Sequence, residues 1–153
     1  MSKAPRANAV VGQSGGPTGV INASLAGIIE EAKKHPEIEN LYGAVHAVSG
    51  MVKENFIDLK KLSSETLELV AGSPSSALGS SRDKPDAEYC SRILDVFKKR
   101  NIKYFFYIGG NDSANTAYII NTMAEKSGYD LNAFHVPKTI DNDLLVTDHC
   151  PGY

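Results

Sequence analysis

The sequence is poor in the residues that build disulfides and zinc sites. Its two cysteines, Cys90 and Cys150, match no zinc-binding spacing, and we expect a reducing compartment, so we predict two ordinary thiols. The four histidines are scattered and form no HExxH pair. A metal cluster built on histidine and cysteine is therefore not expected.

The sequence also lacks an excess of either charge and any long apolar run. A formal net charge of −2 gives no electrostatic reason to bind nucleic acid or a membrane surface. No run approaches the roughly 20 apolar residues of a spanning helix, and the start MSKAPRANAV has no apolar signal core. We therefore expect a cytoplasmic protein with neither a nucleic acid nor a membrane as partner.

Hydrophobic residues, in contrast, are plentiful. They make up 42% of the chain, which is enough for a core and argues against disorder. A length of 153 residues fits one domain, since domains most often run to about 100–150 residues.

Strand-like and helix-like segments alternate along the chain. Continuous apolar runs predict strands at 8–12, 41–48, 104–108 and 133–136, with a further short strand around Ile57. Apolar residues at helical spacing predict helices at 20–34, 86–100 and 113–126, and the ambiguous stretch 51–72 offers a short helix at 63–70. This alternation is typical of the α/β class, with a mostly parallel sheet in a three-layer αβα arrangement. Ligands of such folds bind beyond the carboxyl ends of the strands, so the loops that follow strands are the candidate site.

Two glycine pairs each lie between a predicted strand and a predicted helix. Gly15 and Gly16 follow the first strand, and Gly109 and Gly110 follow the third. Such turns let the backbone approach a ligand, and the free N–H groups at a helix start attract an anion. The alternatives are a tight turn that only permits packing and, at the second pair, a helix N-cap. Neither loop has the spacing of a P-loop or of GxGxxG.

The stretch 137–143 combines one cation with two carboxylates. Asp141 and Asp143 lie two residues apart, so in an extended chain they share a face, and Lys138 precedes them. One carboxylate could accept a proton from a hydroxyl, and the lysine could offset charge on a transferring phosphoryl group. The alternative is a solvated turn. Arg82 ends the polar loop 72–82, and its guanidinium suits phosphate oxygens.

Together these residues resemble the phosphofructokinase family. The matching stretches are 14–22, 78–82, 109–113 and 139–143, which occur in the family's order with similar separations over nearly the whole chain. The stretch Thr139-Ile140-Asp141-Asn142-Asp143 is the specific one, whereas the glycine pairs are weak singly. The resemblance implies a Rossmann-like phosphofructokinase fold.

The resemblance also implies a role for each loop. Asp141 would take the proton from the 1-hydroxyl of fructose 6-phosphate, with Thr139 and Asp143 near that substrate. The donor phosphates would be held by a set of five residues, and Asn111 would face the Mg²⁺ that accompanies the donor. The five donor-binding residues are Gly15, Gly16, Arg82, Gly110 and Ser113.

Two positions indicate which donor is used. The ATP-using branch of the family usually has glycine where Asp112 and Lys138 stand. A carboxylate at 112 would repel the α-phosphate of ATP, and a lysine at 138 would supply a cation to a smaller donor. The resemblance is therefore to the pyrophosphate-dependent type, and it implies reversible transfer from pyrophosphate to fructose 6-phosphate in glycolysis, with Asp141, Lys138 and Asp112 as the catalytic set. An ATP-dependent phosphofructokinase is the alternative.

Two departures from the family pattern concern the metal and the length. The family commonly has aspartate where Asn111 stands, and asparagine offers an acceptor oxygen without charge. The family's chain normally continues well past Tyr153, so residues 1–153 are expected to be the N-terminal donor-binding part of a phosphofructokinase-like domain, truncated and without a second domain. Such a piece would bind donor weakly and turn over little, and the full-length protein would be a homo-oligomer.

Two other classes of function compete with this hypothesis. A phosphate-binding module whose catalysis has lapsed is favoured by Asn111 and disfavoured by the retained Asp141. A Rossmann-type oxidoreductase fits the alternation of strands and helices. It lacks the glycine spacing, however, and gives no role to the stretch 139–143.

Overall fold

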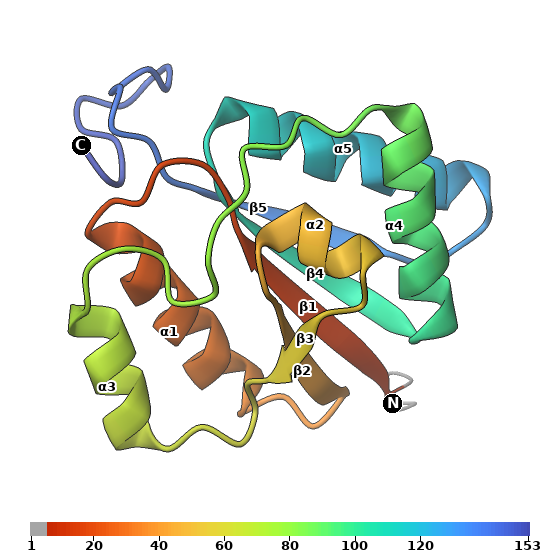
Figure 1. The fold of residues 1–153 in the computed structure, drawn as a ribbon. Coiled ribbons are helices and arrows are strands. Elements are labelled where there is room, and N and C mark those ends of the chain that lie inside the picture. Colours follow the sequence, from red (N-terminus) through yellow and green to blue (C-terminus); the bar gives the residue numbers. More distant parts are fainter. Residues whose placement is uncertain (1–5) are drawn as a thin grey trace.

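The computed structural model describes residues 6–153, and the start of the chain, residues 1–5, on which the expected lack of a signal core partly rests, lies outside that range. Within the described range, helices pack on both faces of one sheet (Figure 1). In chain order the elements are β1 (Ala7–Gln13), α1 (Val20–Ala32), β2 (Ile38–Ala44), α2 (Ala47–Val52), β3 (Phe56–Asp58), α3 (Ser64–Gly72), α4 (Ala87–Lys99), β4 (Ile102–Gly109), α5 (Asn111–Lys126) and β5 (Asn132–Pro137).

The sheet has the strand order β3-β2-β1-β4-β5. Strands β1, β2, β4 and β5 are parallel, and only the short β3 runs antiparallel, against β2. One hydrophobic cluster joins α2, α4 and α5 to one face of the sheet, and a second joins α1 and α3 to the other. The predicted three-layer α/β architecture with a mostly parallel sheet is confirmed.

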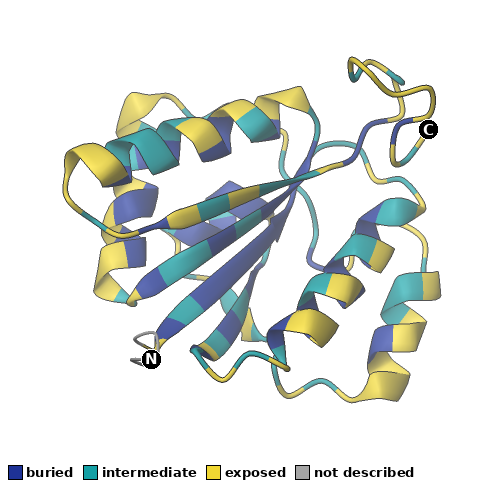
Figure 2. Cartoon of the chain, turned by 180° about the vertical axis from the view of Figure 1, so that it is seen from behind, coloured by how far each residue is buried: buried dark blue, intermediate teal, exposed yellow. Residues whose placement is uncertain are grey.

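Strand β1 lies at the centre of this arrangement. Val10 packs in the cluster on the α4 side, whereas Ala9 and Val11 pack in the cluster on the α1 side. Because the strand is covered on both faces, its central residues 9–12 are continuously apolar rather than alternating. Figure 2 shows burial concentrated in the central strands and on the helix faces turned toward them.

The second predicted strand, 41–48, is wrong in its latter half. The strand β2 ends at Ala44, and the next residues turn out of the sheet because His46 and Ala47 have φ of 61° and 52°. The helix α2 then begins, and a side chain on its Gly50 would stand 1.9 Å from the carbonyl oxygen of Val45. Gly50 therefore lets a helix pack closely and does not close a strand. A short apolar run such as Ala44–Val48 does not distinguish strand from helix by periodicity.

The other predicted elements are present, with bounds set by their caps. Ser63 and Asp86 cap α3 and α4 by accepting hydrogen bonds from backbone N–H groups three residues on, and the short strand β3 contains Ile57. Helix α5 begins at Asn111 rather than at the predicted residue 113, and it ends before Gly128, which has a φ of +68°. None of the described helices is long and apolar enough to cross a membrane.

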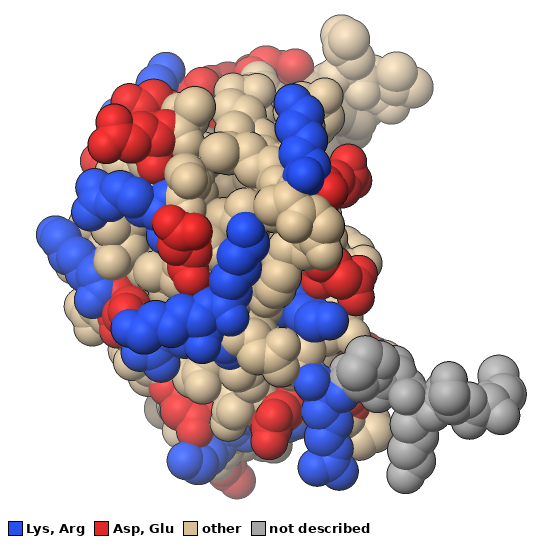
Figure 3. Space-filling model, turned by 90° about the vertical axis from the view of Figure 1, so that its right-hand side faces the viewer, with Lys and Arg blue, Asp and Glu red and all other residues tan. Residues whose placement is uncertain are grey.

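Charged side chains of both signs are interspersed over the surface of the molecule seen in Figure 3. The distribution agrees with the near-neutral net charge of −2.

Candidate functional site

The polar loops that follow three parallel strands meet at one edge of the sheet. Because the carboxyl ends of parallel strands lie at the same edge, the loops after β1, β4 and β5 come together there. With part of the loop before α4, they enclose a cavity of about 670 Å³. Its lining residues are Ser14, Gly15, Gly16, Ser81, Arg82, Asp83, Lys84, Gly110, Asn111, Asp112, Ser113, Lys138, Thr139, Ile140, Asp141 and Asp143.

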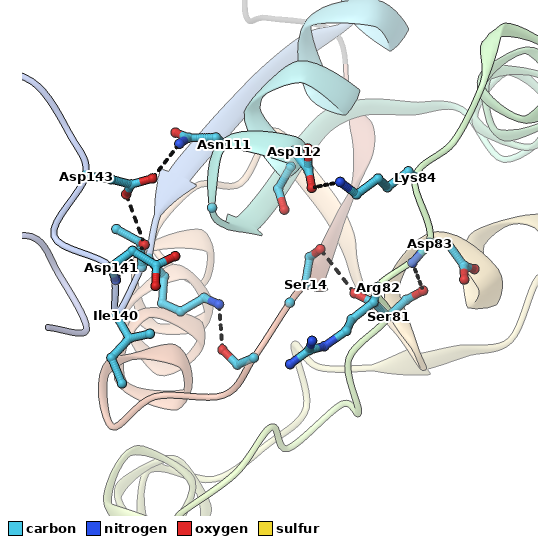
Figure 4. Close-up of a pocket in the computed structure, with 16 residues that line it drawn as sticks. Ser14, Ser81, Arg82, Asp83, Lys84, Asn111, Asp112, Ile140, Asp141 and Asp143 are labelled. Carbon is cyan, nitrogen blue, oxygen red and sulfur yellow. Dashed lines mark hydrogen bonds and ion pairs between the residues drawn. The ribbon is translucent and has the colours of Figure 1, made fainter.

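Figure 4 shows how the walls of this cavity are arranged. Asp141 and Asp143 stand on one wall, and Arg82 and Lys84 stand on the opposite one. The start of α5 lies between the two walls. All eleven residues predicted for the site line this cavity, and their individual roles stay predictions.

The first glycine turn is shaped by contacts with two other loops. Gly15 has a φ of +76°, which disfavours other residues, and its N–H donates to the carbonyl of Ser81 at 2.9 Å. A side-chain carbon on Gly15 would lie 3.2 Å from Nζ of Lys138. The lining stops at Gly16, so it is this turn, and not the first turn of α1, that faces the cavity. The expected role of the α1 N-terminus in attracting an anion is thus not supported by the lining.

Lys138 is an almost fully buried cation in the floor of the cavity. Its side chain is 4% exposed, and Nζ donates to the carbonyl of Gly16 at 2.6 Å. Burial, and then the positive charge of Arg82, lower the pKa of Lys138, while Asp141 acts in the opposite direction. The ammonium is therefore held next to the glycine turn at an electrostatic cost that an anion in the cavity would reduce.

The two carboxylates of the stretch 139–143 have different environments. Both oxygens of Asp143 accept hydrogen bonds, one from Oγ1 of Thr139 at 3.1 Å and one from Nδ2 of Asn111 at 2.8 Å. No side chain of the described residues bonds the carboxylate of Asp141, whose backbone N–H donates to Thr139 at 3.1 Å. Asp143 is thus fixed in place, and Asp141 is open to the cavity.

The segment that carries these carboxylates is a turn, so the expectation of an extended chain with both on one face is wrong. Asn142 has a φ of 51°, which interrupts any extended run. Its side chain holds the turn by accepting from the N–H of Cys150 at 2.8 Å and donating to the carbonyl of Asp148 at 3.2 Å. Both aspartates reach the cavity through this turn geometry.

The side chains at the start of α5 do not cap the helix. Its N-cap is Gly110, without a side-chain cap bond. Asn111 bonds Asp143 instead, and Oδ2 of Asp112 pairs with Nζ of Lys84 at 2.8 Å. The alternative that these residues serve only as caps is therefore wrong. Ser113, in the same first turn of α5, is buried with 4% exposure.

Five lining residues were not predicted from the sequence. They lie within or next to the predicted loops, and Lys84 is the informative one because it pairs with Asp112. A second cation two residues after Arg82, just past the end of the polar loop 72–82, was the signal that could have found it. The five are Ser14, Ser81, Asp83, Lys84 and Ile140.

The cavity fits a magnesium ion that arrives with phosphates better than a preformed metal cage. Among residues 6–153, no three His, Cys, Asp or Glu side chains lie close enough together to hold an ion by themselves. The lining nevertheless offers oxygen ligands in Asp112, Asp141, Asp143 and Asn111. Mg²⁺ is commonly held by one or two carboxylates together with substrate phosphates.

Comparisons with known proteins found similar sequences and structures. The chain is 54% identical over 144 residues to the pyrophosphate–fructose 6-phosphate 1-phosphotransferase of Rhodospirillum rubrum, covering 94% of this chain and 36% of that protein. Its counterpart in Methylococcus capsulatus is 42% identical over 153 residues, with 95% and 36% covered. The crystal structure of a pyrophosphate-dependent phosphofructokinase from Nitrosospira multiformis superposes with a TM-score of 0.89 at 44% identity, over 95% of this chain and 37% of that one.

The chain thus spans about a third of the length of the curated relatives it matches. A family model described as Phosphofructokinase matches residues 8–153, a stretch that includes every loop of the cavity. On this evidence the chain belongs to the phosphofructokinase family.

Proposed function

We propose that this chain is the donor-binding part of an enzyme that transfers a phosphoryl group reversibly between pyrophosphate and the 1-hydroxyl of fructose 6-phosphate. The observation that carries the proposal is the buried Lys138 beside the glycine turn, with its ammonium 2.6 Å from the carbonyl of Gly16. A small polyphosphate in this cavity meets that cation together with Arg82. The proposal draws further support from the printed function of the relatives.

Asp141 is proposed to accept the proton of the attacking hydroxyl. It is suited to this because its carboxylate oxygens have no side-chain partner among the described residues, whereas those of Asp143 are both engaged. The sugar oxygen then forms a bond to the transferred phosphorus, the bridging P–O bond of pyrophosphate breaks, and phosphate leaves. A positioned base contributes roughly 10²–10⁴ in rate.

The remaining side chains are proposed to hold the donor and its charge. Arg82 and Lys138 bind donor phosphate oxygens, and the glycine turns at Gly15 and Gly110 let the backbone come close to the donor. Mg²⁺, held by Asp143 and the amide oxygen of Asn111, would neutralise charge that develops on the phosphates. Thr139 keeps Asp143 in place through its hydroxyl.

Asn111 is proposed to be an adaptation of this site rather than a sign of lost catalysis. Its amide donates to Asp143 at 2.8 Å, which a carboxylate at the same position could not do. The asparagine therefore fixes Asp143 without a metal, and this is the specific observation against the lapsed phosphate-binding module.

Asp112 is proposed to exclude nucleotides. Its carboxylate lines the cavity beside Lys84, and 70% of the side chain is exposed. A nucleotide would bring the charge of its α-phosphate and a bulky base toward that carboxylate, whereas pyrophosphate ends before it. Self-association of the complete polypeptide stays a prediction.

The test is to compare donors in the complete polypeptide that carries these residues. Formation of fructose 1,6-bisphosphate is measured with pyrophosphate and with ATP, each with Mg²⁺. We expect strong preference for pyrophosphate. A preference for ATP would contradict the roles of Asp112 and Lys138, and binding of pyrophosphate without any transfer would favour the binding module.

A further inference from the structure

Two buried side-chain amides link the glycine turn to the loop that carries Arg82. Gln13 is the last residue of β1, Asn22 lies in the first turn of α1, and both are 0% exposed. Neither lines the cavity. We call residues 73–81, which run from the end of α3 to the residue before Arg82, the serine loop.

Gln13 uses its full hydrogen-bonding capacity inside the protein. Nε2 donates to the carbonyl of Ile21 at 3.1 Å and to Oδ1 of Asn22 at 2.9 Å. Oε1 accepts from Oγ of Ser76 at 2.8 Å and from the N–H of Leu78 at 2.9 Å. A side-chain amide has two donors and two acceptor sites, and all four are occupied here.

The side-chain amide of Asn22 is also fully hydrogen-bonded, to Gln13 and to residues of the serine loop. Oδ1 accepts from Gln13 and from the N–H of Ala77 at 2.9 Å. Nδ2 donates to the carbonyl and to Oγ of Ser73, both at 3.1 Å. The two amides therefore bond four residues of the serine loop and have nothing left to offer a ligand; the four are Ser73, Ser76, Ala77 and Leu78.

Because the serine loop is fixed, the position of Arg82 at its end is fixed as well. Its last residue, Ser81, accepts from the N–H of Gly15 at 2.9 Å, and Ser14 forms a parallel bridge with it. Arg82 follows directly, and a side-chain carbon on Gly16 would lie 3.5 Å from its Nη2. The guanidinium of Arg82 is thus held beside the glycine turn by loop backbone that the side-chain amides of Gln13 and Asn22 fix.

A purely apolar pair would fill the same space without selecting one loop conformation. Fully satisfied buried polar networks favour a single arrangement of the segments that they join. The cost of burying two amides is therefore balanced here by order in a loop that has little regular structure of its own.

We propose that Gln13 and Asn22 are positioning residues that act through the serine loop on Arg82 and set the affinity for the phosphate donor. This inference rests on the proposed function for the identity of the donor. It adds two residues that touch neither donor nor acceptor.

The test is a double-mutant cycle in the complete polypeptide, with pyrophosphate and Mg²⁺ as the probe and calorimetric Kd as the first readout. Asn22→Ala is combined with Arg82→Ala, and each is measured alone. We expect Asn22→Ala to weaken pyrophosphate binding roughly 10–100-fold, the worth of a charge-assisted hydrogen bond. In the Arg82→Ala background the same change should have at most about a 2-fold effect, because coupled residues are not additive.

Two further variants separate positioning from loss of fold. Ser76→Ala removes a single bond to Gln13 and should weaken binding in the same direction by a smaller factor. Tyr129→Phe removes hydrogen bonds to the carbonyls of Phe97 and Ile102 near the opposite end of the sheet, so it should lower the unfolding midpoint and leave Kd unchanged. In turnover, the KM for pyrophosphate should rise for Asn22→Ala while that for fructose 6-phosphate stays constant.

The outcomes distinguish this inference from the proposed function. Equal losses with and without Arg82 would overturn the inference and leave the function standing. Binding of pyrophosphate without phosphoryl transfer would refute the function, and the binding cycle would still decide the inference. No binding of pyrophosphate by the wild-type protein would refute both.

Discussion

Replacing Asn111 by aspartate should destabilise the protein at neutral pH. The substitution exchanges an amide donor, 2.8 Å from Oδ2 of Asp143, for a carboxylate oxygen. Two unit charges at that distance repel by about 1.5 kcal/mol in bulk water and about 6 kcal/mol at an effective dielectric of 20. Both side chains are exposed and can move apart, so the lower figure applies.

Two smaller effects complete the estimate. Loss of the hydrogen bond destabilises the protein by about 1 kcal/mol more. A negative charge at the start of α5 stabilises it by roughly 0.3–1 kcal/mol through the helix dipole. We therefore expect Asn111→Asp to lower the free energy of unfolding by about 1–2 kcal/mol at pH 7. Mg²⁺ with pyrophosphate should reduce this loss of stability, because a cation bridges the two carboxylates.

The assay is urea unfolding of the complete polypeptide at pH 7, with and without Mg²⁺ and pyrophosphate. Asn121→Asp is the matched control, since Nδ2 of Asn121 donates to Oε1 of Glu125 at 2.9 Å on the same helix, away from the cavity. An exposed i,i+4 repulsion costs only about 0.2–0.5 kcal/mol. If Asn111→Asp is as stable as the wild type at pH 7, or no worse than this control, the link between Asn111 and Asp143 is not what holds the carboxylate.

Three further predictions concern the chemistry of the cavity. Asp141→Asn should lower kcat roughly 10²–10⁴-fold with little change in the Kd of pyrophosphate, whereas Asp148→Asn in the same exposed loop should not; an unchanged kcat would remove the base. Asp112→Gly should tighten ATP binding by about 5-fold, since a like charge at contact range costs about 1 kcal/mol in water, and unchanged nucleotide affinity would count against the exclusion of nucleotides. Because the pKa of Lys138 lies below its ordinary value of 10.5, the unfolded chain binds more protons between those two values and stability rises with pH across that window. Bound pyrophosphate should raise the pKa of Lys138 back toward its ordinary value, so calorimetry in two buffers at an alkaline pH just below 10.5 should detect proton uptake that Lys138→Met abolishes; equal uptake by both proteins would contradict this.

The regular part of the fold could be predicted because its signals are local. Buried parallel strands are continuously apolar, and the glycine pairs mark where β1 and β4 end, so the edge that carries the cavity followed from the order of elements. Helix α2 could not be found in this way. Its start depends on left-handed backbone at His46 and Ala47, which the apolar run conceals.

The candidate site, like the fold, combines residues that local sequence signals predict with contacts that they do not. Residues that belong to compact motifs, such as Asp141 and Lys138, were identified from the sequence and line the cavity. Pairings across long separations were not, because Lys84 and Asp112 meet only through the folded chain. The partnership of Gln13 with Ser76, 63 residues apart, left no local signal for the same reason.

The hydrogen bond from Nζ of Lys138 to the carbonyl of Gly16 joins positions 122 residues apart. A growing polypeptide on the ribosome exposes the glycine turn long before the lysine has been synthesised. Since domains fold as synthesis proceeds from the N-terminus, β1 and α1 can assemble before Lys138 has been added to the chain. The cavity therefore gains Lys138 and the carboxylates of Asp141 and Asp143 only after β5 has been synthesised and has joined the sheet.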